Sequence, residues 1–413
     1  MAAKYSPSAK KWTFMVYLAG DNNLDGNGVT DLNEMKKVGS NDNLNLIAQF
    51  DRAGRKGETK RFYLRKGTTI AKDAVLKLGE TDSGDPKDLI DFIRWGIKNY
   101  PAERYALILW NHGGGWDDKD VYANERMRSI SRAARGRIRH AFFLSNLHKA
   151  VKTAAAGAKP RAILYDDNAK DFLDNVEMKK VLAAAKKAAG RKIDLLGMDA
   201  CLMSMAEVAC QVRASAQYAV GSEQTEPVDG WPYNTMLAAL AKKPAMATRD
   251  FSSIIVDKYI KSYPPSEAVT QSACDLAQSE NLMKVIKELA AILAAGLDNP
   301  AVKTALMQAR VQVQSYEIQE NIDLVDFCKL LAENAALNET IKTACRNVIN
   351  AVCGSGGMVV KSGCKGESVK NSYGMAIYFP TLRVSPLYAK LDFDRKTGWG
   401  GFLNKFINAS RQR

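Results

Sequence analysis

Two residues whose side chains can do covalent chemistry each follow a short apolar run. His112 comes just after residues 105–110, and Cys201 comes just after residues 193–198. A short, almost wholly apolar run is typical of a buried parallel strand, and functional side chains gather beyond the carboxyl ends of such strands. A thiol attacks as its thiolate, and an imidazole can take or give the proton involved. We therefore predict that both side chains lie at one sheet edge and meet there if their strands are neighbours.

The residues beside this pair suit acyl transfer. Residues 113–115 are three glycines, which leave room for a peptide backbone next to the imidazole. The amides of Gly113 and Cys201 are candidate donors to an oxyanion. A helix expected at 202–212 would also direct the positive end of its dipole at the thiol. Spacing alone leaves the alternatives open, because a histidine that ends a strand can be structural and a cysteine can simply be packed.

The elements around these residues alternate between strand and helix. Strands are expected at 12–18, 44–50, 105–110, 162–165, 193–198 and 217–221, and helices at 85–100, 175–189 and 202–212. Such alternation predicts an α/β fold whose mostly parallel sheet is covered by helices on both faces. A small hairpin is expected to pair 61–64 with 68–70.

The pattern becomes mostly helical from about 248 to 353, with one strand expected at 269–274. Strands return at 358–361 and 373–379, followed by a helix at 399–407. Because strands return, we interpret the helical stretch as an elaboration of the core and not as a tethered domain. The predicted division is a core at 10–245, a mainly helical subdomain at 246–356, and a segment at 357–413 that returns to the core.

Composition narrows the classes of protein. The 413 residues carry a net charge of +14 and are 46% hydrophobic, as in a globular protein. The basic residues are dispersed, and the cluster at 126–139 has no aromatic residues for base stacking, which disfavours a nucleic-acid partner. No stretch approaches the ~20 apolar residues of a membrane span, and the first residues lack the apolar centre of a secretory signal. The chain is therefore expected to be intracellular, or to have lost a leader.

The cysteines show no metal-binding spacing. Seven are present, at 201, 210, 274, 328, 345, 353 and 364, and none forms a CxxC pair. Most of them are therefore expected to be buried packing residues.

Four motifs, in this order along the chain, resemble the clostripain family of cysteine peptidases, which belongs to the caspase-like clan. They are AGDNNLD (19–25), LILWNHGGGW (107–116), LLGMDACLMSMAEVA (195–209) and SEQTEPVDGWPY (222–233). The resemblance covers about 10–240 and continues more weakly to SYGMAIYFP (372–380). It implies a caspase-like fold and a monomeric endopeptidase that cleaves peptides or proteins after arginine, sometimes lysine.

The resemblance also implies roles for particular residues. His112 and Cys201 would form the catalytic dyad, with Gly113 in the oxyanion hole. Asp199 and Asp229 would line the pocket for the basic side chain, since carboxylates pair well with guanidinium. Glu223 and Glu226 are secondary candidates for the same acidic rim. For Asp199 a helix cap, and for Asp229 a plain turn, remain alternatives. A catalytically silent binding module with the same fold is the alternative function.

Family members mature by cutting themselves between the histidine and the cysteine, so the resemblance implies a zymogen. Arg126 and Arg128, in a basic stretch expected to be an exposed loop, are the first candidates for that cut. The chemistry needs no cofactor, although some members require calcium. Residues 21–26 resemble the start of an EF-hand loop, but Leu32 stands where the ligating glutamate should be. The family also suggests a secreted or periplasmic protein.

Overall fold

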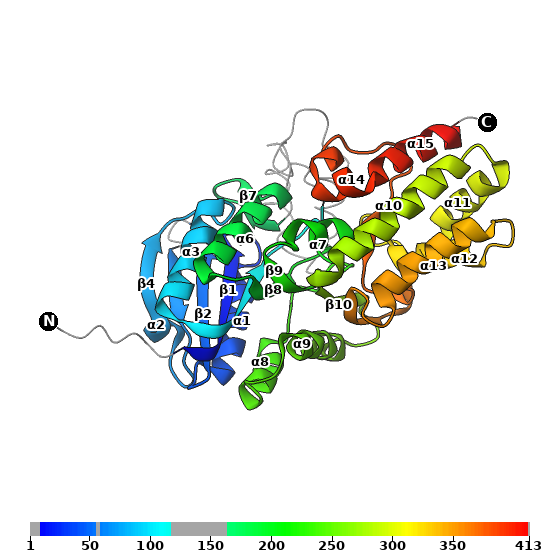
Figure 1. Ribbon diagram of the computed structural model, residues 1–413. Helices are drawn as coiled ribbons and strands as arrows, with labels where there is room; N and C mark the ends of the chain where they lie inside the picture. Colours follow the sequence, from blue (N-terminus) through cyan, green and yellow to red (C-terminus); the bar gives the residue numbers. More distant parts are fainter. Residues whose placement is uncertain (1–8, 55–57, 117–162, 412–413) are drawn as a thin grey trace.

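A nine-stranded sheet forms the centre of the protein in this computed structural model, which describes residues 9–54, 58–116 and 163–411 (Figure 1). Its strand order is β12-β10-β9-β8-β5-β1-β2-β3-β4. The bounds are β1 (Lys10–Gly20), β2 (Leu44–Arg52), β3 (Thr59–Tyr63), β4 (Ala74–Gly79), β5 (Ala102–Trp110), β8 (Ile193–Asp199), β9 (Ala216–Gly221), β10 (Val269–Asp275) and β12 (Val359–Lys365). The strands from β9 to β2 run parallel, and the antiparallel strands lie at the two edges.

The parallel strands are buried on both faces, which explains their nearly continuous apolar sequences. In β1, Met15 and Tyr17 enter one core and Phe14 and Val16 enter the other. The first core is covered by α3 (Pro86–Asn99), α6 (Asn175–Ala189) and α7 (Ala206–Val212). The second is covered by α1 (Asp25–Val38), α8 (Tyr233–Lys242) and α9 (Thr248–Ser262). The α/β class and the two-sided covering predicted from the alternation are therefore confirmed.

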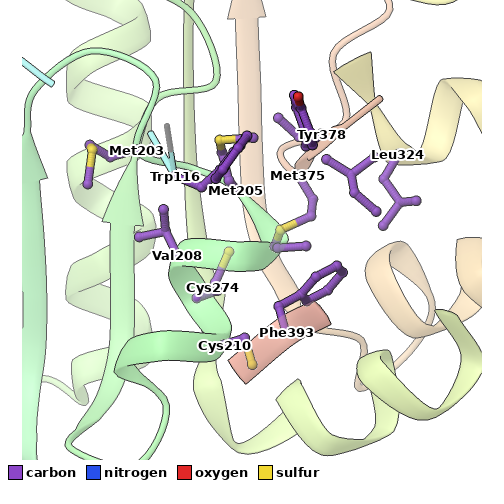
Figure 2. Close-up of a cluster of buried hydrophobic side chains, with 14 of the residues drawn as sticks. Trp116, Met203, Met205, Val208, Cys210, Cys274, Leu324, Met375, Tyr378 and Phe393 are labelled. Carbon is purple, nitrogen blue, oxygen red and sulfur yellow. The ribbon is translucent and has the colours of Figure 1, made fainter. Parts of the chain in front are cut away.

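The C-terminal helices pack together at the end of the sheet where β10 and β12 lie (Figure 1). They are α10 (Ser279–Gly296), α11 (Pro300–Gln312), α12 (Leu324–Glu333), α13 (Glu339–Cys353), α14 (Asp392–Thr397) and α15 (Trp399–Arg411). Figure 2 shows the junction, where Met205 and Val208 lie near Leu324, Met375 and Tyr378 in one apolar cluster. The helices thus share a core with the central sheet, while the domain boundaries at 245 and 356 stay predictions.

Most predicted elements are present, and three predictions are wrong. The partner of β3 is β4, because 70–73 forms the short helix α2 (Ile70–Asp73) in place of the expected strand at 68–70. The strand β6 (Ile163–Asp166) lies outside the main sheet and forms a separate two-stranded sheet with β7 (Asp171–Leu173). The helix expected to begin at Leu202 begins at Ala206, because Leu202 has a left-handed backbone with φ 64°.

One buried carboxyl ties α7 to the C-terminal segment. Glu207 is fully buried, and its Oε1 accepts hydrogen bonds from the amide of Tyr378 (3.0 Å) and the hydroxyl of Tyr388 (2.7 Å). Burial raises the pKa of Glu207 to about 7, although both hydrogen bonds oppose this shift. The folded protein therefore holds a proton on Glu207 that the unfolded chain releases above its ordinary pKa of 4.5.

We expect the Glu207→Gln variant to flatten the pH dependence of stability. Because the folded pKa is the higher one, the wild-type contribution is complete below pH 4.5 and is lost as the pH rises through 7. Glutamine keeps the acceptor and never ionises. Between pH 5 and 8 the wild-type free energy of unfolding should fall by about 2 kcal/mol more than that of the variant, measured by urea unfolding. Equal changes in both proteins would contradict this role.

Candidate active site

The pairing of β5 with β8 brings the two reactive residues to one edge of the sheet. Trp110 lies opposite Asp199 in this parallel pair, and the amide of Asn111 donates to the Asp199 carbonyl at 3.3 Å. His112 and Cys201 each stand two residues beyond this matched pair. The condition that their strands be neighbours is therefore met, whereas the catalytic roles of the two residues stay predictions.

Gly113 carries the backbone of the histidine loop directly against that of the cysteine. A Cβ at this position would lie 2.3 Å from the Cys201 carbonyl oxygen and 3.1 Å from the Cys201 nitrogen. No side chain fits at such distances, so only glycine allows the two loops to approach. Gly113 also forms an isolated β-bridge with Ile163. The participation of the Gly113 and Cys201 amides in an oxyanion hole stays a prediction.

The imidazole of His112 is held by the turn that follows β1. Its Nε2 lies 2.8 Å from Oδ1 of Asn23, and the edge of the ring meets Tyr165 with a centroid distance of 6.2 Å. Burial lowers the pKa of His112 to about 4, so the ring is neutral at pH 7. The sequence interpretation did not include Asn23. Since β1 is the other neighbour of β5, the strand-end argument applied to β1 would have found it.

The thiol of Cys201 is enclosed by the segment that follows β9. The residue is 2% exposed, the amide of Glu226 donates to Sγ at 3.2 Å, and Sγ lies 3.9 Å from the Glu226 carbonyl oxygen. Burial raises the pKa of Cys201 to about 12, and the Glu226 amide opposes this only in part. The thiol is therefore neutral at pH 7 in this arrangement.

The helix dipole expected behind Cys201 is absent from that position. Because α7 begins at Ala206, residues 201–204 are not helical: 201–202 form a turn, and the segment lies against residues 222–226. The Leu202 amide donates to the Gln224 carbonyl at 3.2 Å, and the Ser204 amide donates to the Ser222 carbonyl at 2.8 Å. A positive φ at a leucine is rare and strained, and such strain is often found at functional sites.

A second carboxyl accompanies Asp199 below the cysteine. Asp199 is 4% exposed and accepts a hydrogen bond from the Tyr233 hydroxyl at 2.7 Å. It is not a helix cap, since no helix begins beside it. Its carboxyl is within hydrogen-bond range of the buried carboxyl of Glu226, whose Oε1 accepts from Trp231 Nε1 at 3.4 Å and from Gln271 Nε2 at 3.3 Å. Glu226 is therefore part of this acidic site.

Asp229 lies on the turn that covers this pair. Its side chain is exposed, and the next residue, Gly230, has φ +56°. A Cβ on Gly230 would lie 3.1 Å from Oδ1 of Asp199, so the turn sits directly over the buried carboxyl. Asp31 of α1 is also buried here and feels the charges of Asp199 and Asp229, and burial raises its pKa to about 9. The structure therefore brings the two predicted pocket residues together.

Other predicted features lie away from this geometry. Arg126 and Arg128 fall outside the described residues. Among the residues that the structure describes, no group of three or more His, Cys, Asp or Glu side chains is arranged to hold a metal ion, so no calcium site is assigned. The 21–26 segment comprises the turn between β1 and α1 (21–24) and the first two residues of α1. In the same described part of the chain, no helix is long and apolar enough to cross a membrane.

Comparison with known proteins places these features in a wider group. The sequence model described as the clostripain family matches residues 16–133 and 139–405. Clostripain of Hathewaya histolytica is 30% identical over 226 residues, which make up 49% of this chain and 36% of that protein. The chain thus spans little more than a third of that relative's length.

Two solved structures share the fold over nearly their whole length. One is a secreted C11 cysteine protease from Bacteroides thetaiotaomicron in complex with an irreversible peptide inhibitor; it has a TM-score of 0.63 and 17% identity, and covers 96% of this chain and 99% of its own. The other is an inactive zymogen C11 protease from Parabacteroides distasonis; it has a TM-score of 0.64 and 19% identity, and covers 95% and 99%. At these identities the likeness establishes the fold only.

We expect the buried thiol to react slowly in the intact chain. The exposed Cys353 serves as an internal reference. Because Cys201 is enclosed and neutral, iodoacetamide at pH 8 should label it at least about tenfold more slowly than Cys353, as measured by peptide mass spectrometry over time. Faster labelling of Cys201 would mean that its thiol is already open and activated.

Proposed function

The chain belongs to the clostripain family, and on that premise we propose that it is a cysteine endopeptidase that cleaves after arginine or lysine. One observation carries the proposal. His112 and Cys201 stand at matched positions beyond two adjacent parallel strands, with a buried acidic site beside the cysteine. A nucleophile, a proton carrier and a subsite for a cationic side chain are the parts that such a peptidase needs.

The mechanism follows from these parts. Cys201 gives its proton to His112 and attacks the substrate carbonyl as the thiolate. The amides of Gly113 and Cys201 donate to the resulting oxyanion. His112 then protonates the leaving amine, and water hydrolyses the thioester. Asn23 acts as a positioning residue, because its contact with Nε2 fixes the plane of the ring.

The acidic site provides the specificity. Asp199 and Glu226 lie at its base, and Asp229 lies on its exposed rim. A guanidinium can reach several carboxylate oxygens at once through its planar fork of donors, and a lysine ammonium can use the same acceptors with fewer contacts. Arginine should therefore be the preferred residue before the cleaved bond.

We further propose that the intact chain is a latent precursor. The enclosed, neutral thiol supports this, because a thiol in that state is a poor nucleophile. The residues on both sides of the stretch that contains Arg126 and Arg128 are anchored. Trp116 packs between Tyr378 and Tyr388, with ring centroids 4.3 and 4.8 Å apart, and Ile163 bridges to Gly113. A cut in between would leave both new ends attached to the body.

We propose a monomer that meets peptide or protein substrates outside the cytoplasm, either secreted or in a periplasm. The description of the relative from Bacteroides thetaiotaomicron as secreted supports that location. The proposed chemistry uses no metal or other cofactor.

The first test of this function is cleavage of a fluorogenic peptide with arginine before the reporter. Wild-type protein should cleave it after the maturation cut, and Cys201→Ala should not. Asp229→Asn should lower kcat/KM for arginine about tenfold, because it removes one carboxylate from the rim. Asp257→Asn, an exposed change on α9, is the matched control and should have no effect. If neither the intact nor the cut protein shows turnover that depends on Cys201, the binding-module alternative takes its place.

The second test concerns maturation. Wild-type and Cys201→Ala proteins are incubated side by side, and new N-termini are sequenced. We expect a cut after Arg126 or Arg128 in the wild type only, with both fragments eluting together in size-exclusion chromatography because β5 and β8 remain paired. The same fragmentation in both proteins would rule out self-processing.

A further inference from the structure

Two carboxyl groups touch at the base of the acidic site without a cation beside them. Asp199 and Glu226 are within hydrogen-bond range of each other, and both are more than nine-tenths buried. Among the described residues, neither forms an ion pair with a basic side chain. In the same part of the chain, the groups that donate hydrogen bonds to them are neutral and belong to Trp231, Tyr233 and Gln271.

Two ionised carboxylates cannot remain in contact in such a place. Their repulsion and the cost of desolvating both charges favour a state in which one proton lies between them. The hydrogen-bond pattern fits this state. Oε2 of Glu226 is buried and has no donor among the described groups, so a proton on the pair satisfies an atom that otherwise has none.

We propose that Asp199 and Glu226 share one proton at the base of the pocket and that an entering guanidinium or ammonium group expels it. The pair then carries one negative charge when the pocket is empty and two when a cationic side chain is bound. The proton passes to solvent, and no bond other than the O–H bond breaks. This inference deepens the proposed arginine specificity and rests on it.

The buried titratable groups around the pair stay neutral at pH 7, so the pair itself is the group whose charge changes on binding. Asp31 of α1 has a pKa raised by burial to about 9, so it stays neutral at pH 7. Tyr233 of α8 and Tyr259 and Tyr263 of α9 also have pKa values raised by burial and remain neutral. The pKa of Cys201 is likewise raised by burial. Asp229 adds a charge at the rim.

Burial raises the pKa values of both carboxyls of the pair toward or above the neutral pH range. It raises the pKa of Asp199 to about 6 and that of Glu226 well above its ordinary value, and Asp199 raises the latter further. A cation at contact distance opposes both effects, because its charge favours the ionised form of each carboxyl. The pocket therefore becomes more acidic only when a basic side chain is present. A neutral side chain gains nothing from the second charge.

Calorimetry with an uncleavable probe tests this coupling. N-acetylagmatine carries the arginine guanidinium but lacks the carbonyl that a peptidase attacks. We titrate it into wild-type protein, before and after any maturation cut, at pH 7 in phosphate and in Tris, whose ionisation enthalpies differ. The difference in heat between the buffers should correspond to about one proton released per probe bound. The affinity should rise roughly tenfold from pH 6 to pH 7.

Two variants separate the pair from the rest of the pocket. Glu226→Gln keeps the acceptor for Trp231 and Gln271 but holds no titratable proton, so the probe should bind with almost no proton release and little pH dependence. Asp229→Asn should weaken binding while the proton count stays near one. Binding to wild type with equal heats in both buffers would overturn proton sharing and leave arginine recognition standing. A probe that binds neither the intact nor the cut protein would overturn both.

Discussion

The parallel pairing of β5 with β8 is the constraint on which the site depends. Trp110 stands opposite Asp199, so the segments that follow β5 and β8 leave the sheet at the same level and at the same edge. A slip of one residue would turn the side chains that follow one strand toward the opposite face. Gly113 makes this close approach of the two loops sterically possible, because without a side chain there the His112 loop can lie against the Cys201 backbone.

Residues 222–226 connect this edge to the C-terminal helices. At one end of the segment, the Glu226 backbone encloses the Cys201 thiol. At the other end, Glu223 is fixed by residues far along the chain, since its carboxylate accepts from the Tyr316 hydroxyl at 2.8 Å and the Gly374 amide at 3.1 Å. The helical elaboration thus holds the segment that encloses the Cys201 thiol. A rearrangement of either partner would alter access to the thiol.

Buried acids recur around the site, and several lie beside another carboxyl. The carboxyl of Glu223 lies within hydrogen-bond range of Asp323, as that of Glu226 does of Asp199, and burial is the largest cause of the raised pKa in all four. Burying like charges together is costly unless protons or a cation neutralise them. For the pair below Cys201, the proposed substrate would provide that cation. The pair at Glu223 lies between the core and the helices, where burial raises the pKa of both carboxyls.

The sequence by itself determined most of the strands, the helices on either face of the sheet, and the positions of His112 and Cys201 just after β5 and β8. The almost wholly apolar composition of 105–110 indicates a buried strand. Residues 175–189 have the apolar spacing and the capping residues of a helix. The family resemblance added the roles. Local signals failed where long-range contacts decide the backbone. Leu202 has a left-handed backbone and its amide donates a hydrogen bond to the carbonyl of Gln224, a residue of another segment. The helix α7 therefore begins after it, at Ala206.

Only the tertiary structure decided how the site is completed. Asn23 reaches His112 from the turn after β1, and Glu226 reaches both the thiol and Asp199 from a loop. The distances along the sequence between these residues do not indicate that they are in contact. Tertiary structure also excluded β6 from the main sheet and enclosed Cys201. The physical reason is common to all of these features. Strand and helix formation follows from neighbours in sequence, whereas burial, pKa and hydrogen-bond partners are set by residues that meet only after folding.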